Sequence, residues 1–242
     1  MEHYYALFSG GLDSVLAVLK VLAQEKDVVV SPLFFDYGQK AAEKEEEAVA
    51  NLVPLLKDYG RRNNAVVEDY RKYKIGGTDL FKWSESAILK GREDFGDIDL
   101  ENRNMILISI AISIIMSDRK RGKTHGKKQG LIVGFKNEHY DTRRRFALGL
   151  NQILGQGDFS VEIVTPLVAD DDVVGWHSLA KQICSIEGSV ALLPLTWSCY
   201  YPTSEGSPCK RCPPCESRSE LTQEVGTRTR MKSEGRGDTE RQ

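Results

Sequence analysis

The stretch of sequence that decides the fold is Ser9-Gly10-Gly11-Leu12-Asp13-Ser14. A short apolar run, residues 4–8, precedes it, and residues 14–24 carry apolar side chains at helical spacing. The stretch therefore lies where a first strand passes into a first helix. Two adjacent glycines permit positive φ, so successive backbone N–H groups can face one concavity, and Ser14 opens the helix at its positive end. These features predict a cradle for a pyrophosphate group.

Two other phosphate-binding patterns do not fit this sequence. The chain has no Gly-x-x-x-x-Gly-Lys, because Gly122-Lys123-Thr124 lacks the first glycine at the required spacing. Residues 9–14 also lack the dinucleotide fingerprint Gly-x-Gly-x-x-Gly. They resemble the Ser-Gly-Gly-x-Asp-Ser loop of the PP-loop ATP pyrophosphatase superfamily, whose members cleave ATP between the α- and β-phosphates. A strand–helix turn that binds no ligand is the alternative.

Strand-like and helix-like patterns alternate along the rest of the chain. Strands are expected at residues 28–35, 65–67, 131–135 and 161–167, and helices at residues 41–57, at 104–116 and from 170–172 onward. We expect the helix at 41–57 to end or kink near Pro54, and residues 70–101 to be irregular. The alternation predicts an α/β fold with a parallel sheet covered on both faces.

Composition argues against an exported or membrane protein. The chain begins without the basic region of a signal peptide, and its longest apolar run, residues 105–116, is too short to cross a bilayer. We therefore expect a cytoplasmic protein with no membrane partner, whose five cysteines stay reduced. The net charge of −2 favours no particular partner, but six of the ten residues at 119–128 are basic. That run is either a solvated loop or a contact for phosphates.

Four cysteines near the C-terminus have metal-ligand spacing. Two Cys-x-x-Cys turns share a cysteine, and a further cysteine precedes them by ten residues; the four are Cys199, Cys209, Cys212 and Cys215. Four thiolates can complete a tetrahedral zinc site that has no open position, so the site is expected to be structural. An iron–sulfur cluster is the main competitor. Cys184 lies in an apolar helical pattern and is expected to be a core residue.

Together these motifs resemble the QueC family of 7-cyano-7-deazaguanine synthases. The shared features, in chain order, are the loop at 9–14, Phe34-Phe35-Asp36-Tyr37-Gly38-Gln39, Arg103-Asn104, Thr165-Pro166-Leu167, Cys199-Tyr200 and the cysteines at 209–215. The resemblance implies a Rossmann-like PP-loop fold and a ligase that forms AMP and pyrophosphate from ATP with Mg²⁺. It also implies a structural zinc ion, a deazapurine carboxylate as substrate, ammonia as amine donor, and a homodimer.

The resemblance assigns roles residue by residue. The expected ATP-binding residues are Phe8, Ser9, Gly10, Gly11, Leu12, Asp13, Ser14, Asp36, Asn104 and Gly134. The expected catalytic residues are Asp13, Ser14 and Arg103. The expected substrate-binding residues are Tyr37, Gln39, Lys136, Glu138, Tyr140, Asp141 and Arg143. We expect the ATP-binding α/β domain over residues 1–190, the zinc-binding region over 191–220, and a disordered tail over 221–242, where few large apolar residues remain.

The sequence departs from the family pattern at the substrate end. The segment 134–143 differs from the usual one, Glu101-Asn102 replaces a Pro-Gly pair, and residues 169–172 replace an expected Trp and Lys. These changes leave open a QueC-like antiviral-defence branch, of the CBASS type, that joins a deazaguanine acid to a protein amine. A nucleic-acid-binding module that uses the cysteines and the run at 119–128 is an alternative of another class. It leaves the loop at 9–14 unexplained, so a nucleic-acid partner is not expected.

Overall fold

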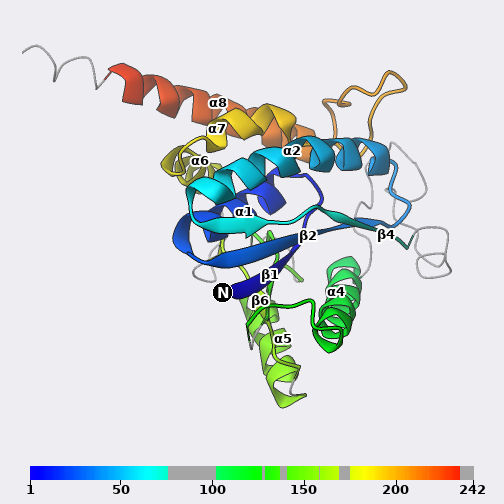
Figure 1. The fold of residues 1–242 in the computed structure, drawn as a ribbon. Helices are drawn as coiled ribbons and strands as arrows, with labels where there is room; N and C mark the ends of the chain where they lie inside the picture. The colour runs from blue at the N-terminus through cyan, green and yellow to red at the C-terminus, as the bar shows by residue number, and fades with distance from the viewer. Residues whose placement is uncertain (76–101, 127–128, 137–140, 158, 169–174, 235–242) are drawn as a thin grey trace, which may run out of the picture.

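A parallel sheet forms the centre of the molecule (Figure 1). The computed structural model describes residues 1–75, 102–126, 129–136, 141–157, 159–168 and 175–234. The strands are β1 (Glu2–Leu7), β2 (Val28–Asp36), β3 (Ala65–Val67), β4 (Arg71–Lys74), β5 (Gln129–Ile132) and β6 (Val161–Val164). Their order is β3-β2-β1-β5-β6, with β4 also paired to β2, and every described pairing is parallel. The predicted parallel α/β fold is confirmed.

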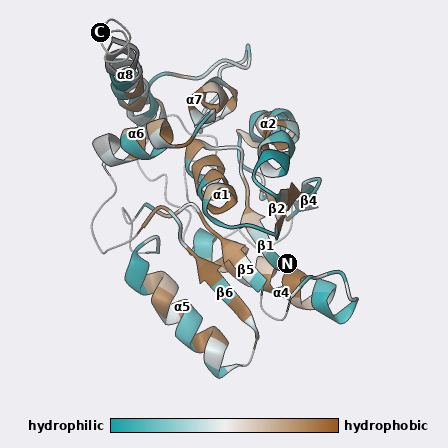
Figure 2. Cartoon of the chain, turned by 60° about the vertical axis from the view of Figure 1, so that its left-hand side comes forward, coloured by the Kyte–Doolittle hydropathy of each residue, from teal (hydrophilic) through white to brown (hydrophobic). Residues whose placement is uncertain are grey.

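Helices cover both faces of the sheet, as parallel strands require. The helices α1 (Leu12–Gln24), α2 (Ala42–Arg62), α6 (Trp176–Ser185), α7 (Ser189–Leu192) and α8 (Pro213–Glu234) lie on one side. The helices α4 (Arg103–Lys120) and α5 (Arg144–Gln156) lie on the other (Figures 1 and 2). The central strands β1 and β2 are therefore apolar along most of their length, and eight of the nine residues of β2 are buried.

The edge of the sheet beside β2 is built from two short strands. Val30 pairs with Val67 of β3, and Leu33 pairs with Arg71 of β4, so both strands run along the same edge. The prediction of an irregular segment from residue 70 is therefore wrong for Arg71–Lys74. This edge strand alternates half-buried and exposed residues and has only one large apolar side chain, Tyr73, so it lacks an apolar run that would mark it as a strand.

Two helices extend further than their sequences indicated. Helix α2 continues past Pro54 to Arg62. The apolar stripe continues through the buried Leu56 and Tyr59, which anchor the last turns. Pro54 itself is exposed. The helix α4 continues beyond residue 116 to Lys120. Within the described ranges, no helix combines the length and apolar character that a membrane crossing requires.

The C-terminal helix corrects the expected disordered tail. Helix α8 runs from Pro213 to Glu234, and it packs against α6. Leu221 and Val225 are one helical turn apart and are only 1% and 3% exposed. These two side chains bury enough apolar surface to hold a largely polar helix on the domain. Residues 235–242 of the expected tail, and the helix start expected at 170–172, lie outside the described residues.

Candidate active site

The loop between β1 and α1 is fixed by glycine geometry. Gly10 has φ +74°, and a Cβ there would lie 3.0 Å from the Ala48 Cβ and 3.0 Å from the Glu45 carbonyl oxygen, both on α2. The Ser14 hydroxyl donates to the Gly11 carbonyl at 2.8 Å, and the Gly11 N–H donates to Ser9 Oγ at 3.3 Å. Because the loop turns through a left-handed residue directly against α2, glycine is required at position 10.

The amino end of α1 has the character of an anion site. In the described part of the chain, no side chain caps this helix, and Gly11 takes the cap position. The positive end of the helix dipole therefore faces the cavity described below. Lys136 lies beside the same turn, with its Nζ 3.5 Å from Asp13 Oδ2.

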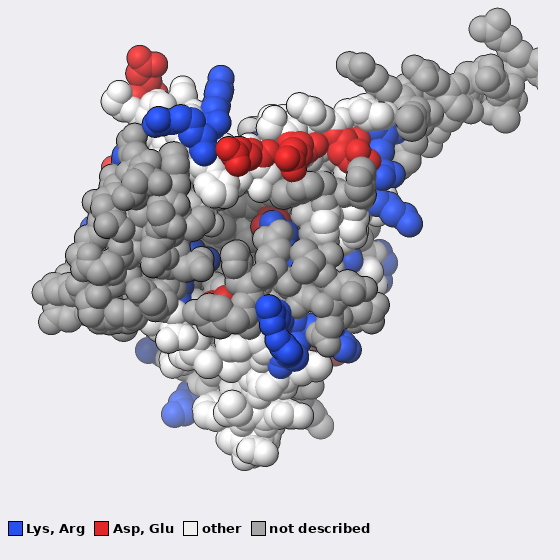
Figure 3. Space-filling model, turned by 180° about the vertical axis from the view of Figure 1, so that it is seen from behind, with Lys and Arg blue, Asp and Glu red and all other residues white. Residues whose placement is uncertain are grey.

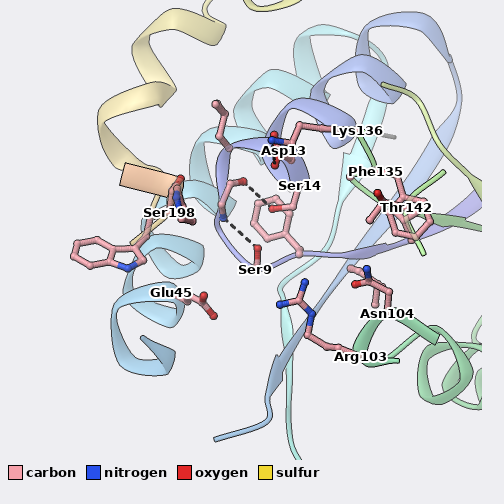
Figure 4. Close-up of a pocket in the computed structure, with 18 of the residues that line it drawn as sticks. Ser9, Asp13, Ser14, Glu45, Arg103, Asn104, Phe135, Lys136, Thr142 and Ser198 are labelled. Atoms are coloured by element: carbon pink, nitrogen blue, oxygen red, sulfur yellow. Dashed lines mark hydrogen bonds and ion pairs between the residues drawn. The ribbon is translucent and has the colours of Figure 1, made fainter. Parts of the chain in front are cut away.

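A cavity of about 400 Å³ opens at the carboxyl ends of β1, β2 and β5 (Figure 4). Its lining includes the loop and the residues that follow β5, together with side chains from α2, α4 and α8. Among the expected site residues, those that line it are Phe8, Ser9, Gly11, Leu12, Asp13, Ser14, Tyr37, Arg103, Asn104, Gly134, Lys136 and Asp141. One face of the molecule is visibly hollowed, and both acidic and basic side chains lie within the hollow (Figure 3).

Gly134 lets the end of β5 approach the loop. A Cβ at this position would lie 2.8 Å from the Asp13 carbonyl carbon and 2.9 Å from the Ser14 nitrogen. Such distances are too short for a carbon atom, so any side chain would push the two segments apart. The expected ATP-site residue Gly134 therefore has a steric reason to be glycine, and Lys136, two residues later, lines the cavity.

A charged and aromatic cluster lies on another side of the cavity. The side chains of Arg103 and Glu45 point toward one another (Figure 4), and Tyr37, Tyr200 and Asp141 lie within electrostatic range of Arg103. Burial raises the pKa of the Tyr37 phenol to about 12; Arg103 opposes this shift and Glu45 adds to it. Burial also raises the pKa of the Glu45 carboxyl, while a hydrogen bond from Gln39 and the charge of Arg103 oppose that shift. The cluster can donate hydrogen bonds to a polar ring and accept hydrogen bonds from it.

Gln39 lies behind the cavity wall instead of in it. It is 5% exposed, and its Nε2 donates to Glu45 Oε2 at 2.7 Å and to the Phe35 carbonyl at 3.3 Å. Its Oε1 accepts the Tyr37 N–H at 2.9 Å. Gln39 therefore orients two cavity residues, Glu45 and Tyr37. The carboxylate of Asp36 accepts the Gly38 N–H at 3.1 Å and stabilises the same turn.

Several expected site residues are not in the cavity lining, and several lining residues were not expected. Those outside the lining are Gly10, Asp36, Gln39 and Arg143. Glu138 and Tyr140 lie outside the described residues. The unexpected polar and aromatic lining residues are Phe35, Glu45, Phe135, Thr142, Trp197, Ser198, Tyr200, Ser217 and Arg218. The sequence motifs included Phe35 and Tyr200, and the segment 134–143 included Phe135 and Thr142, but none of these was expected in the site; the others reach the cavity through tertiary contacts.

The cysteine region forms one wall of the cavity. The Trp197 N–H donates to the Gly10 carbonyl at 3.0 Å, which ties the segment before Cys199 to the phosphate loop. Pro213 and Pro214, between the last two cysteines, also line the cavity. The expected zinc-binding region therefore contributes residues to the cavity wall.

The four predicted zinc ligands converge. The sulfur atoms of Cys199, Cys209, Cys212 and Cys215 lie within 4.8 Å of one another. A tetrahedral zinc ion with bonds of about 2.3 Å would hold its sulfurs roughly 3.8 Å apart, and the sulfurs of Cys209 and Cys215 are 4.0 Å apart. Backbone N–H groups also donate to the sulfurs of Cys199 and Cys209. The cluster fits one zinc ion, whereas an iron–sulfur cluster would place iron and sulfide between the thiolates and hold them further apart.

Comparison with known proteins agrees with this site. The family profile described as "Queuosine biosynthesis protein QueC" matches residues 4–226. The 7-cyano-7-deazaguanine synthase 1 of Desulfitobacterium hafniense (strain Y51) is 28% identical over 222 residues, covering 90% of each chain. The 7-cyano-7-deazaguanine synthase of Campylobacter concisus (strain 13826) is 30% identical over 232 residues, covering 90% of this chain and 92% of the relative. The predicted resemblance is confirmed, and the chain belongs to the QueC family.

Proposed function

We propose that this protein uses ATP to activate the carboxylate of 7-carboxy-7-deazaguanine and, with ammonia, converts it to the amide and then to the nitrile. The observation that carries the proposal is the cavity of about 400 Å³, which joins the phosphate loop to the cluster around Arg103 and Glu45. A nucleotide phosphate chain and a polar ring can thus meet in one space. Membership of the QueC family supports the same reaction.

The proposed reaction uses two molecules of ATP. The substrate carboxylate attacks the α-phosphorus of the first ATP, the bond to the β-phosphate breaks, and pyrophosphate leaves. Ammonia then attacks the acyl carbon, so AMP and a proton depart and the amide forms. The amide oxygen attacks a second ATP in the same way, and loss of AMP and protons leaves the carbon–nitrogen triple bond. AMP is a far better leaving group than the oxygen of a free carboxylate or amide.

The phosphate loop is proposed to hold the leaving pyrophosphate. The backbone N–H groups near the start of α1 and the hydroxyls of Ser9 and Ser14 would bind its oxygens, where negative charge grows in the transition state. Mg²⁺, when bound, would neutralise part of the phosphate charge, and Asp13 is the carboxylate on the loop suited to hold it. Lys136 adds a positive charge beside the same turn.

The cluster on the other side of the cavity is proposed to hold the deazapurine. The guanidinium of Arg103 would bind the carboxylate and orient it toward the α-phosphate, because its fork matches two carboxylate oxygens. Glu45 would accept hydrogen bonds from the N–H groups on the pyrimidine edge of the ring, with Tyr37 beside it. Lys136 and Asp141 are the other expected substrate residues in the lining.

The test is product analysis with purified protein, ATP, Mg²⁺, ammonium and 7-carboxy-7-deazaguanine. We expect AMP and pyrophosphate as nucleotide products and the nitrile by mass spectrometry. Replacing Arg103 by Gln should lower kcat/KM by about 10²-fold or more, since it removes a charge that acts on the reacting group.

The control is Arg61→Gln, because Arg61 is exposed and pairs with Asp58 at the surface. This variant should keep wild-type activity. Formation of ADP and phosphate would contradict the proposed bond cleavage. A product that stops at the amide would contradict the second activation step.

A further inference from the structure

Arg218 is a cation in the cavity wall that has no role in the proposed reaction as described above. It lies on α8, three residues after Cys215, and it lines the cavity as a half-buried residue. Its Nη1 donates to Thr196 Oγ1 at 2.6 Å and to Ser198 Oγ at 3.5 Å. Its Nη2 donates to the Leu193 carbonyl. These contacts use three of the five N–H groups of a guanidinium.

Every acceptor of Arg218 is neutral. Across the described ranges, no Asp or Glu carboxylate lies within ion-pair distance of it. Two other cations do have a carboxylate nearby. Lys136, in the cavity, lies beside Asp13, and Arg228, on the same helix as Arg218, pairs with Glu224. Withdrawing a guanidinium from water is costly unless an anion compensates it. An anion bound in the cavity would supply the missing partner.

A short connection joins Arg218 to the phosphate loop. Ser198, which contacts the guanidinium, follows Trp197, whose N–H binds the Gly10 carbonyl at 3.0 Å. Gly11 lies against the same segment, because a Cβ there would be 3.4 Å from the Trp197 carbonyl oxygen. Ser198 and Lys136 lie on opposite sides of the loop (Figure 4). Positive charge is thus available to the loop from two directions.

We propose that Arg218 binds the β- and γ-phosphoryl groups of ATP, and the pyrophosphate that leaves, from the side of the loop opposite to Lys136. A guanidinium can contact two phosphate oxygens at once, which a point charge such as Lys136 cannot do as well. The inference rests on the proposed use of ATP, but not on the identity of the second substrate. It also gives the cysteine region a role in catalysis, because zinc at Cys215 would order the first turn of α8 and hold Arg218 in place.

A competing explanation is that Arg218 compensates the negative charge of the zinc-bound thiolates and fastens residues 193–198. In that case its loss would lower zinc content and weaken the binding of every nucleotide. If Arg218 binds pyrophosphate, its loss would affect only ligands that carry β- and γ-phosphates. AMP distinguishes the two explanations, because it has neither group.

The experiment is calorimetric titration of the zinc-containing full-length protein with Mg²⁺-pyrophosphate and, separately, with AMP, without any deazapurine. Arg218→Gln should raise the Kd for pyrophosphate roughly 10- to 100-fold, as expected for loss of a charge-assisted hydrogen bond. Its Kd for AMP should stay within about twofold of wild type, since no AMP contact is removed. Arg218→Lys, which keeps the charge, should recover part of the lost affinity.

The matched control is Arg228→Gln on the same helix, because Arg228 already has a carboxylate partner and does not line the cavity. It should bind both ligands like wild type. Wild-type pyrophosphate affinity in Arg218→Gln would overturn the inference. The inference would also be overturned if both Arg218 variants lost AMP affinity as much as pyrophosphate affinity, or if metal analysis showed that both had lost zinc. Because the titration contains no deazapurine, its result stands apart from the product analysis that tests the proposed reaction.

Discussion

Individual residues fix how closely the segments around the phosphate loop can approach. Gly10 must be glycine for its positive φ, whereas Gly134 has another reason, since a Cβ there would collide with the backbone of Asp13. The sequence predicted the first, because paired glycines after a strand mark such a turn. It could not give the reason for Gly134, because Gly134 and Asp13, 121 positions apart in the chain, meet only in the folded sheet.

A buried polar chain on β1 and β2 had no sequence signal. The imidazole of His3 is 1% exposed, its Nε2 lies 2.7 Å from Ser31 Oγ, and its Nδ1 accepts the His125 N–H at 3.3 Å. The Ser31 hydroxyl donates to Glu68, so Nε2 of His3 must donate to Ser31. Only the neutral imidazole satisfies both contacts, because a protonated Nδ1 would face another N–H. Burial lowers the pKa of His3 to about 4, with Glu68 opposing the shift.

The buried, neutral His3 predicts that the protein loses stability as the pH falls from about 6.5 toward 4. In that window an unfolded His3 binds a proton and the folded one does not, so protonation favours the unfolded state. The free energy of unfolding of wild type should therefore fall by about 1–2 kcal/mol more than that of His3→Gln across the window. Urea unfolding at pH 7.5, 6 and 5 measures this.

The control for the pH series is His125→Gln, which keeps the backbone N–H that contacts His3. His125 is exposed, and its charge only adds to the burial that lowers the pKa of His3, so this variant should keep most of the wild-type pH dependence. Equal pH dependence in wild type and His3→Gln would contradict the assignment of a neutral, buried His3.

At the scale of elements, the sequence indicated strands and helices well where an apolar run is continuous. The bounds of β3 were predicted as Ala65–Val67, and β2 was predicted to within one residue. The edge strand β4, the end of α2 after residue 57 and the whole of α8 were missed. Each is anchored by a few side chains that pack on another element, so its stability comes from tertiary contacts and not from a local pattern.

The cysteine region combines a predicted part and an unpredicted part. The spacing of the cysteines was enough to predict the four ligands, because tight turns bring such residues together. That the region also walls the cavity depends on the contact between Trp197 and Gly10, which no local pattern encodes. The region and α8 therefore act as one unit in which a metal site supports a binding wall.

Removal of zinc is therefore expected to loosen this wall as well as the protein. Cys212→Ser, or treatment with a chelator, should abolish bound zinc and lower the unfolding free energy by on the order of several kcal/mol. Pyrophosphate affinity should fall too, because Arg218 and Trp197 lose their support. Metal analysis, thermal unfolding and calorimetry measure the three effects.

Cys184→Ser is the matched control, since Cys184 lies on α6 outside the cluster and should leave zinc content unchanged. Iron in place of zinc in the wild-type protein would contradict the assigned metal. Full pyrophosphate affinity in a zinc-free protein would contradict the support that the metal gives to the wall.

At the scale of the whole molecule, the cavity lies where the chain order of the sheet reverses. From β1 the chain proceeds to β2 on one side, while β5 and β6 lie on the other, and ligands of open α/β sheets bind at the carboxyl ends of strands at such points. The described part of the basic run, residues 119–126, precedes β5 and so lies toward the opposite end of the sheet. It therefore gives no contact for phosphates at the cavity.

The two sides of the site differ in how far they could be predicted. The core of the nucleotide side is one contiguous loop, which a sequence pattern can reveal, whereas Lys136 and Arg218 come to it from other parts of the chain. The other side draws Glu45 from α2, Arg103 from α4 and Tyr200 from the cysteine region, so only the fold brings them together. Residues 137–140, which include two expected substrate ligands, lie outside the described residues.

The central claim is that the loop at residues 9–14 holds the two outer phosphates of ATP. A crystal structure with α,β-methylene-ATP and Mg²⁺ tests it most directly, because this analogue cannot be cleaved between the α- and β-phosphates. We predict β- and γ-phosphoryl oxygens within hydrogen-bond distance of backbone N–H groups at residues 11–14, with the α-phosphate on the side of Arg103. Electron density that places the outer phosphates away from this loop, or the adenine base against it, would contradict the claim.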